Sequence, residues 1–211
     1  MIRIENTEVG NFEAAIRGMR NPMNSWAQSD SEWSDVDGTY HIGEKDLELM
    51  RKLVSAGNDH SKFMRMIYVA VDVIAPLYWW KEASTYKVGT VANSCSTMHK
   101  IAAKRFELDD FSHEKMHDST LNILEIVVNN LNYARDMYLI SESENKKSYW
   151  WQMIQLLPSS YNQRRTLFLN YAVLRNMYHA RKEHKLDEWR AFCSWIEELP
   201  YSELITMKKG D

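Results

Sequence analysis

The chain has 211 residues, of which 45% are hydrophobic and 26% are charged, a composition that excludes wholesale disorder and fibrous repeats. The 26 lysines and arginines against 29 acidic residues give a formal net charge of -3, which argues against nucleic acid or an anionic membrane as partner. Residues 1–5 have no apolar signal core and no stretch approaches a membrane span of roughly 18 apolar residues, so we expect a cytoplasmic protein.

Few helix breakers interrupt the chain, since it contains only seven glycines and four prolines, and most segments between them repeat apolar residues at helical spacing. The elements we expect in the first half are a strand over 1–5, a helix over 12–19 with Asn11 as N-cap, a loop over 23–43, a helix over 44–56, a strand over 64–75 and a helix over 77–81.

The second half is predicted to be more helical than the first. In chain order we expect a turn or loop over 85–93, a helix over 98–105 capped by Ser96 or Thr97, a long helix over 112–140, a helix over 149–157, a strand over 166–169, a helix over 170–181 capped by Asn170 and a helix over 186–199. We find no internal repeat and no linker. The sequence therefore predicts a single α/β (α+β) domain over residues 1–211, with a small central sheet and long helices.

A short motif, His113-Glu114-Lys115-Met116-His117, matches the H-E-x-x-H zinc pattern, in which two imidazoles one helical turn apart bind the metal and the glutamate activates water. Its flanks are polar, as at the solvated start of a helix, and no third ligand is marked in the sequence. We therefore expect no metal here. A zinc-dependent hydrolase using His113, Glu114 and His117 remains an alternative reading.

The two cysteines, Cys95 and Cys193, lie far apart in the sequence and show no metal-ligand spacing. In a chain without a secretion signal, reduced thiols are the default. We expect both to be buried and to pack as small apolar side chains.

A polar loop follows the predicted strand that ends at Pro76. Within residues 76–100, hydroxyl, amide and cationic side chains gather after a pair of tryptophans: Thr85, Tyr86, Lys87, Thr90, Asn93, Ser94, Ser96, His99 and Lys100. Such a density of donors suits a phosphate group or the polar edge of a heterocycle. The alternative is an ordinary surface loop over a core that contains Trp79 and Trp80.

An aromatic segment over residues 164–190 is punctuated by Arg175, Asn176, Arg181 and Arg190. The guanidinium fork suits a planar anion such as a deprotonated pyrimidine, or a phosphate, because it donates two parallel hydrogen bonds. The alternative reading is a solvated helix face.

Together these two segments resemble the flavin-dependent thymidylate synthase (ThyX) family in the order and spacing of residues over about 57–204. The resemblance rests on NDHSKF before the strand, Ala75-Pro76, Leu157-Pro158, Thr166, Asn170, Leu174, Arg175-Asn176, Arg181, His184 and Glu188-Trp189-Arg190. It implies a ThyX-like fold, a homotetramer with FAD at the subunit interfaces, and a pyrimidine nucleotide (dUMP) and methylenetetrahydrofolate as substrates, with NADPH as co-substrate.

The signature loop of that family departs from its pattern in this chain. Thr85, Tyr86 and Lys87 stand where the family has Arg-His-Arg, and Met98 falls at or beside a further family arginine. The arginine that precedes the family's Leu-Pro is replaced by Ile154 or Gln155. The resemblance therefore allows two readings, a divergent methylase or a nucleotide-binding relative with altered catalysis.

Carried over residue by residue, the resemblance implies roles for eleven positions. It implies catalytic roles for Ser96 and Arg181, cofactor binding by Thr85, Tyr86, Lys87, Asn93, Asn170 and Asn176, and substrate binding by Glu82, Ser94, Ser96, His99 and Arg181. In this chemistry the flavin carries the hydride, so the protein has only to bind and polarise the uracil ring.

Overall fold

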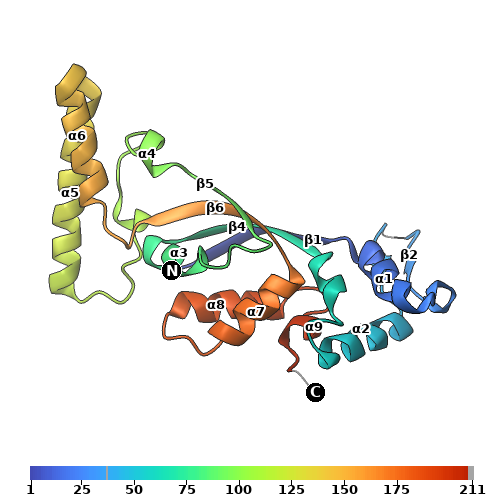
Figure 1. The fold of residues 1–211 in the computed structure, drawn as a ribbon. Helices are drawn as coiled ribbons and strands as arrows, with labels where there is room; N and C mark the ends of the chain where they lie inside the picture. Colours follow the sequence, from blue (N-terminus) through green and yellow to red (C-terminus); the bar gives the residue numbers. More distant parts are fainter. Residues whose placement is uncertain (37, 209–211) are drawn as a thin grey trace. The chain divides into compact units, whose positions relative to one another are not determined.

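The computed structural model describes residues 1–36 and 38–208, and in them helices alternate with strands (Figure 1). The strands are β1 (Arg3–Gly10), β2 (Glu32–Trp33), β3 (Tyr40–His41), β4 (Tyr68–Pro76), β5 (Val91–Ser94) and β6 (Asn162–Asn170). The helices are α1 (Phe12–Arg20), α2 (Glu44–Ala56), α3 (Leu77–Ala83), α4 (Thr97–Lys100), α5 (Asp118–Ile140), α6 (Ser143–Leu156), α7 (Tyr171–Arg181), α8 (Asp187–Glu197) and α9 (Glu203–Thr206). The predicted α/β class is confirmed. No helix in these residues is both long and apolar enough to cross a bilayer.

Four strands form one sheet in the order β1-β4-β6-β5, and β2 with β3 forms a separate short hairpin. Hydrogen bonds between the residues that flank β4 and β6 show that these two strands are antiparallel. The amide of Leu77, just after β4, donates to the carbonyl of Tyr161, just before β6, and the amide of Tyr171, just after β6, donates to the carbonyl of Ile67, just before β4. Every second residue of β4 is buried, as its β-branched run predicts.

The chain divides into two compact units built from interleaved segments. The first contains residues 1–3, 73–85 and 93–166, and the second contains residues 4–72, 86–92 and 167–211. All four strands of the larger sheet, β1, β4, β5 and β6, contribute residues to both units. This interleaving is the reason why the sequence shows no linker.

The core of the first unit lies along two long helices. Helices α5 and α6 pack side by side (Figure 1), and a buried apolar cluster joins them to the segment before α5. Its buried members are Ile101, Phe106, Phe111, Leu124, Val128, Leu131, Ala134 and Met153. The members from α5 recur every three or four residues, which is the spacing of one helix face.

The core of the second unit is rich in aromatic side chains, and in it α7 packs against both α8 and α9. Tyr171 and Trp189 are fully buried, and Phe12 meets the ring of Tyr171 edge to face at a centroid distance of 5.9 Å. These contacts place the C-terminal end of α7 beside the first turn of α8, where the candidate site lies.

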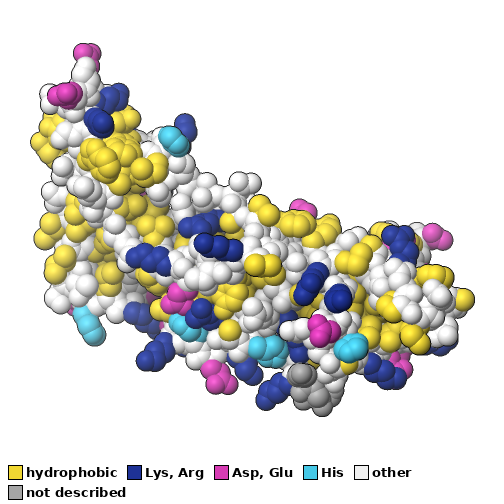
Figure 2. Space-filling view, in the orientation of Figure 1, with side chains coloured by type: hydrophobic (Ala, Val, Ile, Leu, Met, Phe, Trp, Pro, Cys, Tyr) yellow, Lys and Arg dark blue, Asp and Glu magenta, His cyan; other side chains and the backbone are white. Residues whose placement is uncertain are grey.

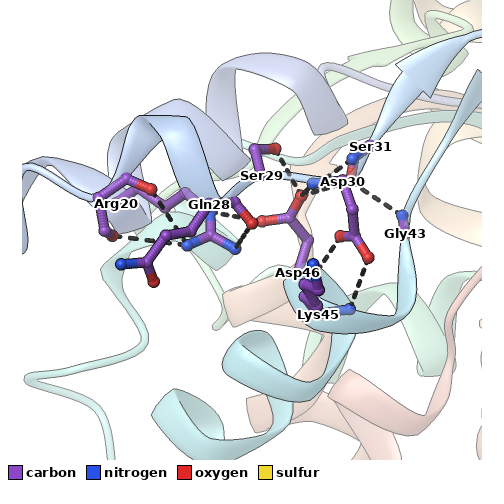
Figure 3. A network of polar contacts seen from close by, with 9 residues as sticks. Arg20, Gln28, Ser29, Asp30, Ser31, Gly43, Lys45 and Asp46 are labelled. Carbon is purple, nitrogen blue, oxygen red and sulfur yellow. Dashed lines mark hydrogen bonds and ion pairs between the residues drawn. The ribbon is translucent and has the colours of Figure 1, made fainter.

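A buried ion pair joins α1 to the start of α2 in the second unit (Figure 3). The Nε of Arg20 donates to Oδ1 of Asp46 at 2.6 Å, and both side chains are almost inaccessible to solvent. The other carboxylate oxygen of Asp46 accepts from the hydroxyls of Ser29 and Ser31, each at 2.6 Å. Burial by itself would raise the pKa of Asp46, but these three hydrogen bonds outweigh burial and lower that pKa below its usual value.

The start of α2 is capped by a carboxylate from outside the helix. Gly43 occupies the N-cap position and has no side chain to offer, so Asp30 accepts hydrogen bonds from the amides of Lys45 and Asp46 (Figure 3). A Cβ on Gly43 would come within 2.4 Å of the carbonyl oxygen of Asp30, so the close approach requires glycine.

Several predicted boundaries are wrong. The long helix begins at Asp118 and not near residue 112, the loop predicted over 23–43 contains the β2–β3 hairpin, and β6 begins four residues before the predicted strand. In the first half of β6, the polar residues Gln163 and Arg165 take the positions of the alternating apolar residues. Both lie on the same strand face as the buried Leu167 and Leu169.

Candidate functional site

Arg181 lies against two aromatic rings in the second unit, and we call Tyr86, Arg181 and Trp189 the arginine cluster. The Nε of Arg181 donates to the hydroxyl of Tyr86 at 2.9 Å. Its guanidinium carbon is 5.0 Å from the ring centroid of Trp189 and 5.6 Å from that of Tyr86. Cation–π contact and the hydrogen bond together orient the guanidinium before any ligand arrives.

The helices that carry this cluster are fixed by local interactions. The side chain of Asn170 accepts from the amide of Val173 and caps α7, as the sequence predicts. Arg181 ends that helix, where a cation is favoured by the helix dipole. Trp189 is fully buried, with its ring edge-on to the ring of Phe192 at 5.9 Å.

The part of the signature loop that lies in the second unit packs against the start of α7. Gly89 has a φ of +77°, and a Cβ on it would lie 3.0 Å from Nδ2 of Asn170 and 3.1 Å from Val173. The neighbouring Thr90 has a buried hydroxyl that finds no hydrogen-bond partner among the described residues. Such an orphaned hydroxyl is costly unless a ligand or water satisfies it. Lys87 is exposed on the same loop.

The other predicted loop residues belong to the first unit, and their interactions there are local. Ser96 caps α4 by accepting from the amide of His99 at 3.1 Å, which confirms the predicted cap. The hydroxyl of Thr85 donates to the carbonyl of Glu82 at 2.7 Å, at the end of α3. Asn93 and Ser94 lie exposed on β5, so the turn or loop predicted over 85–93 is wrong from residue 91 onward.

Of the site residues predicted from the sequence, the structure therefore brings Tyr86 to Arg181, and it places Asn170 beside Gly89 of the same loop. Asn176 lies exposed on α7. Trp189 was not predicted to be a member of the cluster. Its position eight residues after Arg181, at the start of a predicted amphipathic helix, was the available signal.

Two of the other arginines serve the chain itself. Arg175 donates from Nη1 to the carbonyls of Leu204 and Ile205, both at 3.2 Å, and so satisfies carbonyls of α9. Arg190 donates to the carbonyl of His184 at 2.8 Å and pairs with Asp187. Both side chains stabilise turns in the C-terminal segment.

The HEKMH segment does not form the helical arrangement that the zinc motif needs. Residues 113–117 precede α5, and His117 is the extended N-cap residue of that helix. Nδ1 of His113 contacts the carbonyl of Phe111 at 2.8 Å, and Glu114 pairs with the N-terminal amine. In the part of the chain that the structure describes, no three His, Cys, Asp or Glu side chains gather closely enough to hold a metal ion.

The cysteine prediction is half correct. Both thiols are free, and Cys193 is buried, where burial raises the pKa of its thiol to about 11. Cys95 is exposed, contrary to the prediction. It follows β5, where its amide donates to the carbonyl of Arg164 at 3.0 Å and its carbonyl accepts from Nε2 of Gln163 at 2.7 Å.

Comparison with solved structures identifies the fold. The flavin-dependent thymidylate synthase ThyX from Helicobacter pylori, complexed with FAD and dUMP, aligns with a TM-score of 0.67 at 18% identity, over 96% of this chain and 96% of that one. A second structure of that enzyme with FAD and dUMP gives 0.65 at 18% identity, over 97% and 96%. The UMP/dUMP methylase PolB from Streptomyces cacaoi, bound with 5-Br dUMP, gives 0.62 at 12% identity, over 100% and 97%.

No protein-family model matches the sequence, and comparison with curated protein sequences finds no match. The chain thus has the ThyX fold at a low level of sequence identity, which confirms the fold that the resemblance predicted.

Proposed function

We propose that the chain is a flavin-dependent methylase that adds a methyl group at C5 of dUMP or a related pyrimidine nucleotide. Methylenetetrahydrofolate supplies the carbon, and FAD, reduced by NADPH, supplies the reducing equivalents. The observation that carries this proposal is the orientation of Arg181 by Tyr86 and Trp189 in a chain with the ThyX fold.

Arg181 has the chemistry that the pyrimidine needs. When a carbon is bonded to C5 and then reduced to a methyl group, negative charge develops over the ring nitrogen N3 and its flanking oxygens. A guanidinium held in place against aromatic rings stabilises that charge without reorganising during the reaction. Tyr86 therefore acts through Arg181, by holding its Nε at 2.9 Å from the phenol oxygen.

The loop residues fit a polar cofactor in part. Bound flavin would supply the hydride. The buried, unpartnered hydroxyl of Thr90 and the exposed ammonium of Lys87 are groups that a flavin's polar ring edge and phosphates would satisfy. Asn93, Asn170 and Asn176 add amide groups at the positions that the resemblance assigns to the cofactor.

A second candidate is a nucleotide-binding relative that has lost catalysis. Thr85 favours it, because its hydroxyl is used within the chain on the carbonyl of Glu82, at a position where the resemblance expects a cation. Ser96 likewise uses its side chain to cap α4. This candidate binds the nucleotide, as the first one does, but it does not retain a bound flavin.

The flavin separates the two candidates. Purified protein, equilibrated with FAD and freed of excess cofactor, is expected to keep the flavin absorption bands, and these bands should shift when dUMP is added. Protein that binds dUMP but retains no flavin would contradict the methylase and favour the second candidate.

We also propose that the protein is a homotetramer in which α5 lies between copies. A stripe on this helix stays exposed although it is apolar: Ile123, Ile126, Tyr133 and Ile140 are each 60–76% exposed. Figure 2 shows hydrophobic side chains gathered over the α5–α6 region. Positions 126, 133 and 140 are seven residues apart, the repeat of a helix that packs against another helix.

Light scattering at micromolar concentration is expected to give four chains per particle. Replacing Ile126 with Asp should shift this to a smaller particle, because a charge in an apolar interface is costly. The matched control is Glu125→Asp, one position away from the stripe, which should leave the particle size unchanged. A monomeric wild-type protein would contradict the proposal.

A further inference from the structure

A half-buried arginine in the first unit has no anionic partner. Arg165 lies on β6, and within residues 1–36 and 38–208 it makes no ion pair. Burial lowers the pKa of its guanidinium, which is the direction expected when a cation is removed from water without a compensating carboxylate. The charge is therefore held in the fold without a carboxylate among the described residues to neutralise it.

Neutral groups fix the orientation of this guanidinium. Its Nε donates to Oε1 of Gln163 at 3.0 Å, and its Nη1 donates to the hydroxyl of Ser84 at 3.1 Å. The guanidinium carbon lies 4.3 Å from the ring centroid of Trp80. Two of the five N–H groups of an arginine are thus used, and the remaining ones meet no oxygen of the described residues.

Gln163 and Trp80, which contact Arg165, are fixed in turn by hydrogen bonds to backbone carbonyls. Gln163 is buried and donates from Nε2 to the carbonyl of Cys95 at 2.7 Å, so its amide oxygen is directed at Arg165. Trp80 is 2% exposed, and its indole N–H donates to the carbonyl of Gln163 at 2.9 Å. Side chains from α3 and β6 and a carbonyl next to β5 therefore form one connected support, which is typical of a built binding site.

We infer that Arg165, together with the hydroxyl of Ser84, binds a phosphate group of a nucleotide ligand. The free edge of the guanidinium can donate hydrogen bonds to phosphate oxygens, and charge-assisted bonds of this kind are among the strongest in proteins. Ser84 is exposed, so the guanidinium of Arg165 can be reached from solvent on the side of Ser84. The phosphate belongs either to the pyrimidine nucleotide or to FAD. The assignment of the phosphate to one of these two ligands rests on the proposed function. The presence of an anion site at Arg165 does not depend on it.

The chain offers a matched control for this site. Arg164 is the preceding residue of β6, is exposed, and points to the other face of the strand. Arg164→Gln and Arg165→Gln change the net charge by the same amount. They therefore separate a specific anion site from a general effect of charge.

The first experiment titrates inorganic phosphate into the protein by NMR or calorimetry at constant ionic strength. Wild type is expected to bind saturably, Arg165→Gln about ten- to a hundred-fold more weakly, and Arg164→Gln as wild type. Ser84→Ala should weaken binding several-fold while leaving the support of Arg165 by Gln163 and Trp80 in place, and it serves if Arg165→Gln fails to fold. Absence of saturable binding to wild type, or equal weakening by both arginine variants, would overturn the inference.

A second pair of titrations identifies the source of the phosphate. If the pyrimidine nucleotide places its phosphate here, Arg165→Gln abolishes the preference for dUMP over deoxyuridine. If FAD does, the same variant abolishes the preference for FAD over riboflavin. Either result supports the site. If Arg165→Gln keeps both preferences, the site is not a nucleotide site and the inference is overturned. Phosphate binding by a protein that takes neither nucleotide nor flavin would support the anion site and contradict both the proposed function and the assignment of the phosphate to a nucleotide.

Discussion

Replacing Asp46 with Ala is expected to lower the free energy of unfolding by about 3–5 kcal/mol, the cost of breaking a buried ion pair from one side. The substitution leaves the guanidinium of Arg20 buried without its carboxylate, and that side chain is only 4% exposed. It also removes the acceptor for the hydroxyls of Ser29 and Ser31 and for two backbone amides of the same turn. Urea or thermal unfolding followed by circular dichroism measures the change.

The effect should depend on pH in one direction. The folded state lowers the pKa of Asp46, so its contribution to stability is present above the pKa of an unfolded aspartate, about 3.9, and is lost as the pH falls through the lower folded pKa. The stability difference between wild type and Asp46→Ala should be constant near neutral pH and shrink below about pH 4.

Asp35 provides the control, because it is an exposed carboxylate on the same segment. Asp35→Ala should change the unfolding free energy by no more than about 0.5 kcal/mol. A loss for Asp46→Ala no larger than that of Asp35→Ala would show that the buried network does not hold the segment to α2.

Replacing Arg181 with Lys is expected to weaken dUMP binding or turnover about ten- to a hundred-fold, which corresponds to the loss of roughly 1.4–2.7 kcal/mol from one charge-assisted interaction. Lysine keeps the charge, but it loses the planar fork and the hydrogen bond from Nε to Tyr86. Tyr86→Phe keeps the ring beside Trp189 and removes only that hydrogen bond, so a smaller loss of about two- to ten-fold is expected.

Arg190→Lys is the matched control, since Arg190 donates to backbone carbonyls outside the arginine cluster. It should leave the dUMP titration unchanged. If Arg181 were a structural residue only, Arg181→Lys would lower the melting temperature and leave dUMP binding unaltered. That result would remove Arg181 from the site.

The sequence predicted best where local chemistry decides the structure. Helix α2 has the predicted bounds, 44–56, because its apolar stripe repeats at helical spacing and Gly57 ends it with a φ of +111°. The caps by Ser96 and Asn170 were predicted for the same reason: both are short polar side chains just before an amphipathic run, and both accept from an amide three residues on.

Features that depend on distant contacts were not predicted. The start of α5 is set by the turn in which Glu114 pairs with the N-terminal amine and His113 contacts Phe111, and no local pattern announces it. Arg165 was not recognised as a candidate because its significance lies in Ser84 and Trp80, about eighty residues away in the chain. The contact of Arg181 with Tyr86 spans 95 positions and was not predicted, because the family resemblance implied a role for each residue separately.

The most direct test of the proposed methylase is mass spectrometry of the nucleotide after incubation with the protein, FAD, NADPH, methylenetetrahydrofolate and dUMP, with UMP tested in parallel. The account predicts a nucleotide heavier by one methyl group in place of hydrogen, formed only when all components are present and formed at least ten-fold more slowly by Arg181→Lys. An unmodified nucleotide from protein that demonstrably binds both FAD and dUMP would contradict it.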